Sequence, residues 1–504
     1  MVDTKREIER KYEATPETRL PDLSGVAGVA AVADRGTAEL DAVYYDTADL
    51  RLAAASITLR RRTGGDDAGW HLKLPVAPGV RDEIGAPLSD TLPRALRSLV
   101  RARAREAELV PVVRLLSSRR LLHLVGADGE LLAEVGRDSV RARRLLGGDH
   151  ETAWDEIEVE LGDDSDPVVL DQAHKKLVKA GLAPAVAPSK LARALAETGF
   201  AVPAHRPPDT ADAGGRLLAH LREHVGALLA YDPGVRRNLP DAVHQMRVST
   251  RRLRSAFRTY RKILDRTVTD PIGEELKWLA GELGVARDQE VLAERLRARI
   301  DELPRTLLLG PVRGRLRIWT VAQGSGARRR AVATLDSPRY LALLDSLDAL
   351  LADPPLLKAA SGAPEDVLPR AMVKDFHRLE ARIDHALGLP PGPERDLSLH
   401  DARKAAKRAR YAGEAATAAL GRPAKRFAKR MKAVQSVLGD HQDSVVARDT
   451  LRNLAIQSHA AGETSFTWGL LYGQEQRSAA DRERELPEVW ARAADPALRD
   501  RLGG

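Results

Sequence analysis

The sequence contains no cysteine, which excludes disulfide bonds, thiolate metal sites and cysteine nucleophiles. No run of about 18 apolar residues is present, so we expect no membrane-spanning helix. The first residues lack the apolar stretch of a secretory signal, and a cytoplasmic protein without a membrane partner is therefore expected. Aromatic residues make up only 4% of the chain, which leaves few rings for stacking on a nucleobase.

Charged residues, in contrast, are abundant. The 504 residues are enough for two or three domains, and their net charge is +8. The isoelectric point is near 9.6. This basic balance favours polyanionic partners without indicating which polyanion is bound.

The most informative stretch lies near the start of the chain, in the run Glu7-Ile8-Glu9-Arg10-Lys11. In a β-strand, side chains alternate between the two faces. Glu7, Glu9 and Lys11 then share one face, opposite Ile8. Charged groups are costly to bury without partners, so this face meets either water or a charged ligand.

Later segments repeat the same alternation of charged and apolar residues. The charged positions that share a strand face are Arg60 with Arg62, His71 with Lys73, Glu134 with Asp138, and Glu158 with Glu160. A solvated antiparallel sheet would also alternate. Here, however, carboxylates and cations are segregated by strand. This pattern favours a closed barrel whose interior holds divalent cations against a polyphosphate.

These motifs, in this order, resemble those of the CYTH family, the triphosphate tunnel metalloenzymes, over about residues 3–200. The resemblance is carried by Glu7–Lys11, Tyr44–Thr47, Leu59–Arg62, Trp70–Pro75, Glu134 with Asp138, Glu158–Glu160, and Ser189-Lys190. It implies an α+β unit built on an antiparallel β-barrel, the triphosphate tunnel.

The resemblance also implies roles for individual residues. The ligands of Mg²⁺ or Mn²⁺ would be Glu7, Glu9, Glu134, Asp138, Glu158 and Glu160. The triphosphate would be bound by Lys11, Arg60, Arg62, Lys73, Arg114, Arg119 and Lys190. Glu7, Glu9 and Lys11 are the predicted catalytic residues. We interpret His71 as a hydrogen-bond donor to the ligand-binding residues and Glu156 as a residue at the rim of the barrel. Arg120 is an alternative to Arg119 for binding phosphate.

The family contains inorganic triphosphatases, thiamine triphosphatases and adenylate cyclases. Nucleoside and thiamine substrates require ring contacts, and this half of the chain has few aromatic residues to supply them. We therefore predict hydrolysis of inorganic triphosphate. A thiamine or nucleoside triphosphate-acting enzyme, or a polyphosphate-binding protein without turnover, are the alternatives.

Residues 201–215 are rich in proline, glycine and alanine and lack helical periodicity, which indicates a linker. A domain over residues 1–200 precedes it. From about residue 216 to the end at residue 504, the apolar period becomes helical. We therefore predict an all-α second domain.

A stripe of basic residues marks one helix of this second domain. His244, Arg247, Arg251, Arg254 and Arg258 recur at intervals of three and four residues, so they share one helix face. No acidic residue interrupts residues 243–262. The stripe therefore lacks the acidic neighbours that solvated helices usually carry on the same helix.

A second copy of the stripe consists of His400, Arg403, Lys407 and Arg410. Each copy is followed by a Leu-Gly pair, Leu283-Gly284 or Leu438-Gly439, at nearly the same distance from its histidine. This spacing indicates duplication of one helical unit, with halves over about residues 216–355 and 365–504. We expect each half to form a four-helix bundle.

The duplicated stripes resemble the CHAD family, the conserved-histidine α-helical domain. The resemblance implies that both stripes bind inorganic polyphosphate and that the protein associates with polyphosphate granules. Nucleic acid is a less favoured partner, because the basic helices lack interleaved aromatic residues. His244 and His400 would otherwise be capping or core histidines, and Asp288 and Asp443 are predicted to hold arginines in place. The sequence does not indicate an oligomeric state.

Overall fold

The computed structural model describes residues 3–200, 202, 211–324 and 326–502, and it leaves out the side chains of residues 285–288, 323 and 324. The chain forms two compact units, Met1–Arg206 and Pro207–Gly504. Much of the predicted linker lies outside the described residues. Its last part is helical instead, because the side chain of Asp212 caps a helix by accepting a hydrogen bond from the Gly215 amide.

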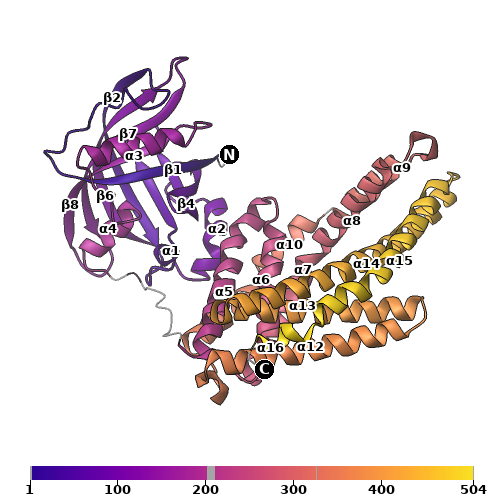
Figure 1. Ribbon diagram of the computed structural model, residues 1–504. Helices are drawn as coiled ribbons and strands as arrows, with labels where there is room; N and C mark the ends of the chain where they lie inside the picture. The colour runs from indigo at the N-terminus through magenta and orange to yellow at the C-terminus, as the bar shows by residue number, and fades with distance from the viewer. Residues whose placement is uncertain (1–2, 201, 203–210, 325, 503–504) are drawn as a thin grey trace. The chain divides into compact units, whose positions relative to one another are not determined.

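The first unit is built on eight antiparallel strands (Figure 1). They are β1 (Asp3–Ala14), β2 (Ala31–Asp46), β3 (Thr58–Thr63), β4 (Gly69–Ala77), β5 (Val80–Pro87), β6 (Val110–Val125), β7 (Leu131–Arg144) and β8 (Glu151–Leu161). The strands close into a barrel in the order β1-β5-β4-β3-β2-β6-β7-β8. Strand β1 completes the closure because residues 3–8 pair with β5 and residues 9–14 pair with β8. The predicted antiparallel barrel is confirmed.

The apolar side chains of this barrel point outwards, where helices cover them. The helices are α1 (Arg51–Ala54), α2 (Arg94–Ala104), α3 (Val168–Lys179) and α4 (Lys190–Glu197). Ile157 and Val159 of β8 pack in one cluster with Leu170 of α3. Leu72 of β4 packs in another cluster with Leu96 of α2. Apolar burial therefore stabilises the outside of the sheet and leaves its inner face to charged groups.

The described residues of the second unit form helices and the segments that connect them. Its α-helices are α5 (Ala213–Arg237), α6 (Ala242–Thr259), α7 (Arg266–Glu282), α8 (Gly284–Asp301), α9 (Val312–Gly324), α10 (Ala327–Leu335), α11 (Pro338–Ala352), α12 (Pro364–Gly388), α13 (Pro393–Leu420), α14 (Arg422–Ala460), α15 (Phe466–Ala493) and α16 (Pro496–Asp500). Two 3₁₀ helices are η1 (Arg305–Leu307) and η2 (Lys358–Ser361). No helix among the described residues is long and apolar enough to cross a bilayer.

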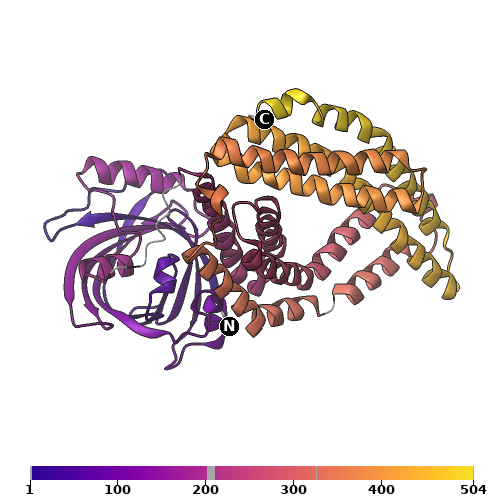
Figure 2. The same ribbon diagram turned by 90° about the horizontal axis from the view of Figure 1, so that it is seen from below.

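The two halves of this unit share an order of helix packing but differ at the position of the Leu-Gly pair. In the second half, α12, α13, α14 and α15 pack in sequence, and the first three run alongside one another in orange (Figure 2). In the first half, α5, α6 and α7 pack in the same way. The second Leu-Gly pair lies inside α14, whereas in the first half Leu283 separates α7 from α8 and Gly284 begins α8. Helices α8 and α9 then share an apolar cluster with α14 and α15, through residues such as Leu296 and Trp468.

Candidate active site

The barrel encloses a cavity of about 340 Å³, which we call the lumen. It is lined by Asp3, Lys5, Glu7, Glu9, Lys11, Tyr44, Thr58, Arg60, Arg62, Asp67, His71, Lys73, Arg81, Glu83, Gly85, Arg119, Glu134, Glu158, Glu160, Ser189 and Lys190. Eight of these side chains are acidic, and eight are lysine or arginine. The lumen is therefore densely charged but nearly balanced.

Strand β1 supplies three neighbouring charges to the lumen. Glu7 and Glu9 are only 2% and 6% exposed, and Lys11 lies beside them. Tyr12 points the other way into the apolar cluster under α3, where Ile8 also packs. The alternation along this strand thus separates the charged lumen from the apolar exterior.

Lysines hold the carboxylates of the lumen in place. Lys73 Nζ lies 2.5 Å from Glu7 Oε1. Lys11 Nζ lies 2.9 Å from Glu9 Oε2 and also contacts Glu158. Burial opposes the charge on Lys11, but the carboxylates of Glu158 and Glu9 outweigh it and raise the pKa of Lys11. Lys11 therefore stays protonated at neutral pH.

Lys190 enters the lumen from the first turn of α4. Ser189 caps this helix by accepting a hydrogen bond from the Ala192 amide, which fixes the position of Lys190. The Lys190 ammonium lies 3.0 Å from Asp138, 2.6 Å from Glu156 and 2.5 Å from Glu158. Burial again opposes the charge, and these carboxylates raise the pKa of Lys190.

Two carboxylates, Asp138 and Glu156, pair with basic side chains of the protein. Asp138 is fully buried, bonds both Arg119 and Lys190, and is not among the residues that line the lumen. Glu156 is only 4% exposed and accepts a hydrogen bond from the Trp154 indole at 2.6 Å. The interpretation of Glu156 as a rim residue was wrong, because a tryptophan and a lysine enclose it.

Strands β3 and β6 supply arginines to the lumen. Arg60 lies 3.7 Å from Glu83 and donates a hydrogen bond to the Tyr44 hydroxyl. Arg62 pairs with Asp67. Arg119 donates to Glu158 at 2.7 Å, as well as to Asp138. All three arginines line the lumen.

Arg114 does not reach the lumen, and its predicted role in phosphate binding is wrong. Its side chain is 49% exposed and pairs with Asp41. Arg114 and Arg119 are five residues apart on β6, and the pairing of β6 with its neighbours has no bulge between them. Residues separated by an odd number lie on opposite faces of a strand. Arg120 is likewise outside, paired with Asp34.

Glu83 is a lumen residue that the prediction omitted. It lies opposite Lys73 in the register of β4 and β5, and His71 Nδ1 is 2.9 Å from its carboxylate. Burial opposes ionisation, but Lys73, His71 and Arg60 lower the pKa of Glu83 well below its usual range. The alternation of Arg81 and Glu83 along β5 was the signal that could have identified it.

Glu134 and Glu160 are the more exposed of the predicted metal ligands, at 33% and 23%. Lys5 pairs with Glu160 at 2.7 Å, while burial and the nearby Glu7 raise the pKa of Glu160. Glu7 Oε2 is buried and has no hydrogen-bond partner in the described part of the chain. The lumen therefore offers carboxylate oxygens, including an unsatisfied one, for a cation.

The basic stripes of the second unit lie on α6 and α13. Arg254 and Arg258 open onto a pocket of about 430 Å³ that Arg261, Arg378 and Arg408 also line. Acidic partners come from a neighbouring helix or from the next turn of the same helix. Arg258 lies 3.7 Å from Glu274 of α7, and Arg410 donates to Glu414, one turn later on α13, at 2.7 Å. The stripes are therefore partly paired, although residues 243–262 contain no acid. His244 lines a different pocket, and His400 has a pKa lowered chiefly by burial.

The two Leu-Gly pairs make room for equivalent arginines. A Cβ atom on Gly284 would lie 2.9 Å from Nη2 of Arg247, and one on Gly439 would lie 3.6 Å from Nε of Arg403. Arg403 also lies 3.8 Å from Asp443, as the sequence suggested. Asp288 belongs to the side chains that the structure leaves undescribed. The repeat thus preserves a close contact between a glycine and a stripe arginine.

Comparison with known proteins gives two family matches. The CYTH domain profile matches residues 5–193, and the CHAD domain profile matches residues 219–452. Rv2226, an uncharacterized protein of Mycobacterium tuberculosis, is 40% identical over 511 residues, covering 98% of this chain and 97% of its own.

Solved structures are similar over parts of the chain. PptA from Streptomyces chartreusis is 22% identical with a TM-score of 0.47, covering 56% of this chain and 99% of its own. The CHAD domain of the plant Ricinus communis is 25% identical with a TM-score of 0.44, covering 58% of this chain and 97% of its own.

Proposed function

Because this chain belongs to the proteins that join a CYTH domain to a CHAD domain, we propose that its lumen hydrolyses inorganic triphosphate with the help of a divalent cation. CYTH domains are the domains of the triphosphate tunnel metalloenzymes, which act on phosphoanhydrides. The observation that carries the proposal is the balanced charge of the lumen, with eight acidic and eight basic side chains around one cavity.

This balance favours a metal–phosphate complex over either ion alone. A bare triphosphate would face eight carboxylates, and a bare cation would face eight lysines and arginines. A complex of the two matches both sets, because each carboxylate meets a cation and each basic group meets a phosphate oxygen. Burial strengthens these interactions relative to water.

The carboxylates fit Mg²⁺ or Mn²⁺, which prefer oxygen donors. The unsatisfied, buried oxygen of Glu7 supports this assignment. Glu7, Glu9, Glu134, Glu158 and Glu160 would hold the ion, whereas Asp138 holds Arg119 and Lys190 in position. When bound, the ion neutralises phosphate charge and lowers the pKa of a coordinated water.

The basic groups of the lumen bind and orient the substrate. Lys11, Lys73 and Lys190, together with Arg60, Arg62 and Arg119, bind phosphate oxygens and orient the chain of phosphates. Their carboxylate partners hold them in position before substrate arrives, so little reorganisation is needed as charge develops on the leaving phosphate. The enclosing barrel limits access of bulk water to the reacting groups.

An inorganic substrate is favoured over thiamine or nucleoside triphosphates. Tyr44 is the only tyrosine, tryptophan or phenylalanine among the described residues that line the lumen. Its hydroxyl already accepts a hydrogen bond from Arg60. A substrate with a planar ring would therefore find little to stack upon.

The helical unit is proposed to bind inorganic polyphosphate and to hold the protein on polyphosphate granules. The pocket at Arg254 and Arg258 supports this proposal, because arginines of α12 and α13 converge there. The other predicted contacts are His244, Arg247, Arg251, His400, Arg403, Lys407 and Arg410. Flexible polyanions suit such a surface because binding is electrostatic and tolerates many registers.

The test is phosphate release from tripolyphosphate, ATP and thiamine triphosphate with Mg²⁺, Mn²⁺ or EDTA. We expect release from tripolyphosphate with metal, none with EDTA, and loss of activity in Glu9→Gln. The matched control is Glu108→Gln, which changes an exposed carboxylate and should retain activity. Tight tripolyphosphate binding without release under any metal would instead support a binding protein.

A further inference from the structure

Helix α5 carries a cluster of metal-ligating side chains that neither the lumen nor the basic stripes use. The sequence from residue 220 to residue 224 reads His-Leu-Arg-Glu-His. His220, Glu223 and His224 are three and four residues apart, so they lie on one face of the helix. Zinc enzymes also use the His-x-x-Glu-His pattern, in which the two histidines bind the metal.

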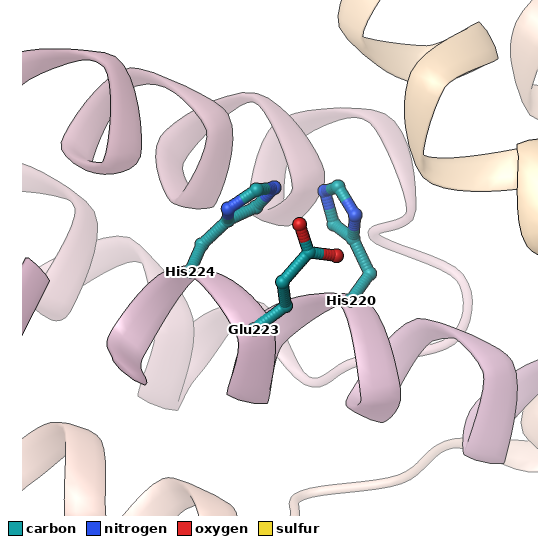
Figure 3. Close-up of side chains that lie close together, drawn as sticks. All are labelled: His220, Glu223 and His224. Carbon is teal, nitrogen blue, oxygen red and sulfur yellow. The ribbon is translucent and has the colours of Figure 1, made fainter. Parts of the chain in front are cut away.

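The three side chains converge. One ligand atom from each lies within 4.8 Å of the other two. The two imidazole rings meet edge to face, with their centroids 4.4 Å apart. The carboxylate of Glu223 lies between the rings (Figure 3). Two ring nitrogens and a carboxylate oxygen thus need only small side-chain adjustments to meet at one ion.

The three residues of the cluster differ in their exposure to solvent. His224 is buried, His220 is half-buried and Glu223 is exposed, so an ion can enter from the side of Glu223. Neither imidazole has a hydrogen bond within the described part of the protein. A bound ion would give a nitrogen of each ring a partner.

The surroundings keep both histidines neutral, the form that binds metals. Burial lowers the pKa of His220 to about 4 and that of His224 to about 3, with Arg252 of α6 contributing to both. Arg252 is paired with Glu414 of α13 at 3.0 Å, and this carboxylate offsets part of its repulsion of a cation.

We propose that His220, Glu223 and His224 bind Zn²⁺, with the remaining coordination position open to water. Two imidazole nitrogens with one carboxylate oxygen are a donor set that zinc takes in proteins. Mg²⁺ prefers oxygen ligands and belongs with the carboxylates of the lumen. The two sites of the chain therefore differ in the metal that they select.

The test measures Zn²⁺ and Co²⁺ binding to the full chain in the presence of excess Mg²⁺, which occupies oxygen-only sites. We expect Zn²⁺ affinity to fall at least about 100-fold in His220→Gln and His224→Gln, since even changes behind a ligand cost roughly 10–100-fold. Co²⁺ should show the strong visible bands of a tetrahedral site in the wild type, and these bands should vanish in both variants.

Matched variants separate metal binding from folding. Glu223→Gln changes an exposed side chain, so it should weaken Zn²⁺ binding without loss of helical circular dichroism. His385→Gln and Asp384→Asn change exposed residues of α12 and should bind Zn²⁺ like the wild type. Unchanged Zn²⁺ affinity and Co²⁺ spectra in His220→Gln, His224→Gln or Glu223→Gln would overturn the three-donor site.

Discussion

The lumen and the basic stripes both gather positive charge for a phosphate chain, but they arrange it differently. In the lumen, cations such as Lys190 are buried among carboxylates and face inwards. On the stripes, residues such as Arg258 are exposed and only loosely paired. A buried, closely paired set of charges suits chemistry on a short chain of phosphates held in a fixed position. An open set suits retention of a long polymer in many positions.

The largest expected effect comes from removing a buried lumen cation. Lys190→Met would leave Asp138, Glu156 and Glu158 without the ammonium that pairs them. Breaking a buried ion pair from one side costs about 3–5 kcal/mol. We expect the free energy of unfolding of the first unit to fall by that order, as measured by denaturant titration, and triphosphatase activity to be lost.

The control for this prediction is Lys175→Met, which removes an exposed lysine from α3. Surface substitutions usually change stability by less than about 0.5 kcal/mol. Equal stability of the two variants would show that the lumen charges are as loosely paired as those of the stripes.

A second prediction concerns catalysis. Lys73→Met would remove a phosphate ligand and the partner of Glu7 Oε1, which lies 2.5 Å from the ammonium. Loss of one preorganised group that stabilises developing charge costs about 10²–10³ in kcat. We expect a decrease of that order with tripolyphosphate, while polyphosphate binding by the helical unit stays unchanged. A parallel loss of both activities would contradict the separation of roles.

A third prediction concerns the stripes alone. Replacing Arg247, Arg251 and Arg254 together with alanine should weaken polyphosphate binding roughly 100-fold, at about 1 kcal/mol for each charge near an anionic surface. Added salt should weaken wild-type binding strongly, because exposed charges are screened over about 8 Å at physiological ionic strength. Binding can be measured by titration with a labelled long-chain polyphosphate.

The matched control for the stripes is a triple variant of exposed arginines elsewhere, Arg313, Arg484 and Arg492, each changed to alanine. It carries the same change in net charge. If it weakens polyphosphate binding as much as the stripe variant does, then overall charge rather than the stripe determines affinity. Stronger binding of duplex DNA than of polyphosphate would overturn the choice of polyanion.

The sequence predicted those features that depend on a period along one element. The period of two placed Glu7, Glu9 and Lys11 on one face of β1, and the helical period placed Arg254 and Arg258 on one face of α6. The prediction failed where that period was not applied, as at Arg114, which lies an odd number of residues from Arg119.

The sequence could not predict features that depend on contacts between distant elements. The enclosure of Glu156 by Trp154 and Lys190 arises only when α4 packs against the barrel. Likewise, the acidic partners of the stripes come from other helices or later turns, such as Glu274 of α7 for Arg258. The convergence of His220 with Glu223 and His224 was visible as a spacing but acquires meaning only from burial on α5.

The smallest expected effect is on the pH dependence of metal binding in the lumen. Burial and Glu7 raise the pKa of Glu160, so protonation of Glu160 favours the folded state, and its charge destabilises that state once the pH exceeds the unfolded pKa. A cation requires the ionised form, so Mn²⁺ affinity should fall as the pH drops through the raised pKa. Glu160→Gln should bind Mn²⁺ more weakly at pH 7 but with a flatter pH profile, and it should unfold at a slightly higher denaturant concentration. An unchanged profile would exclude Glu160 as a ligand and leave the ion to Glu7, Glu9, Glu134 and Glu158, among the paired charges that distinguish the lumen from the stripes.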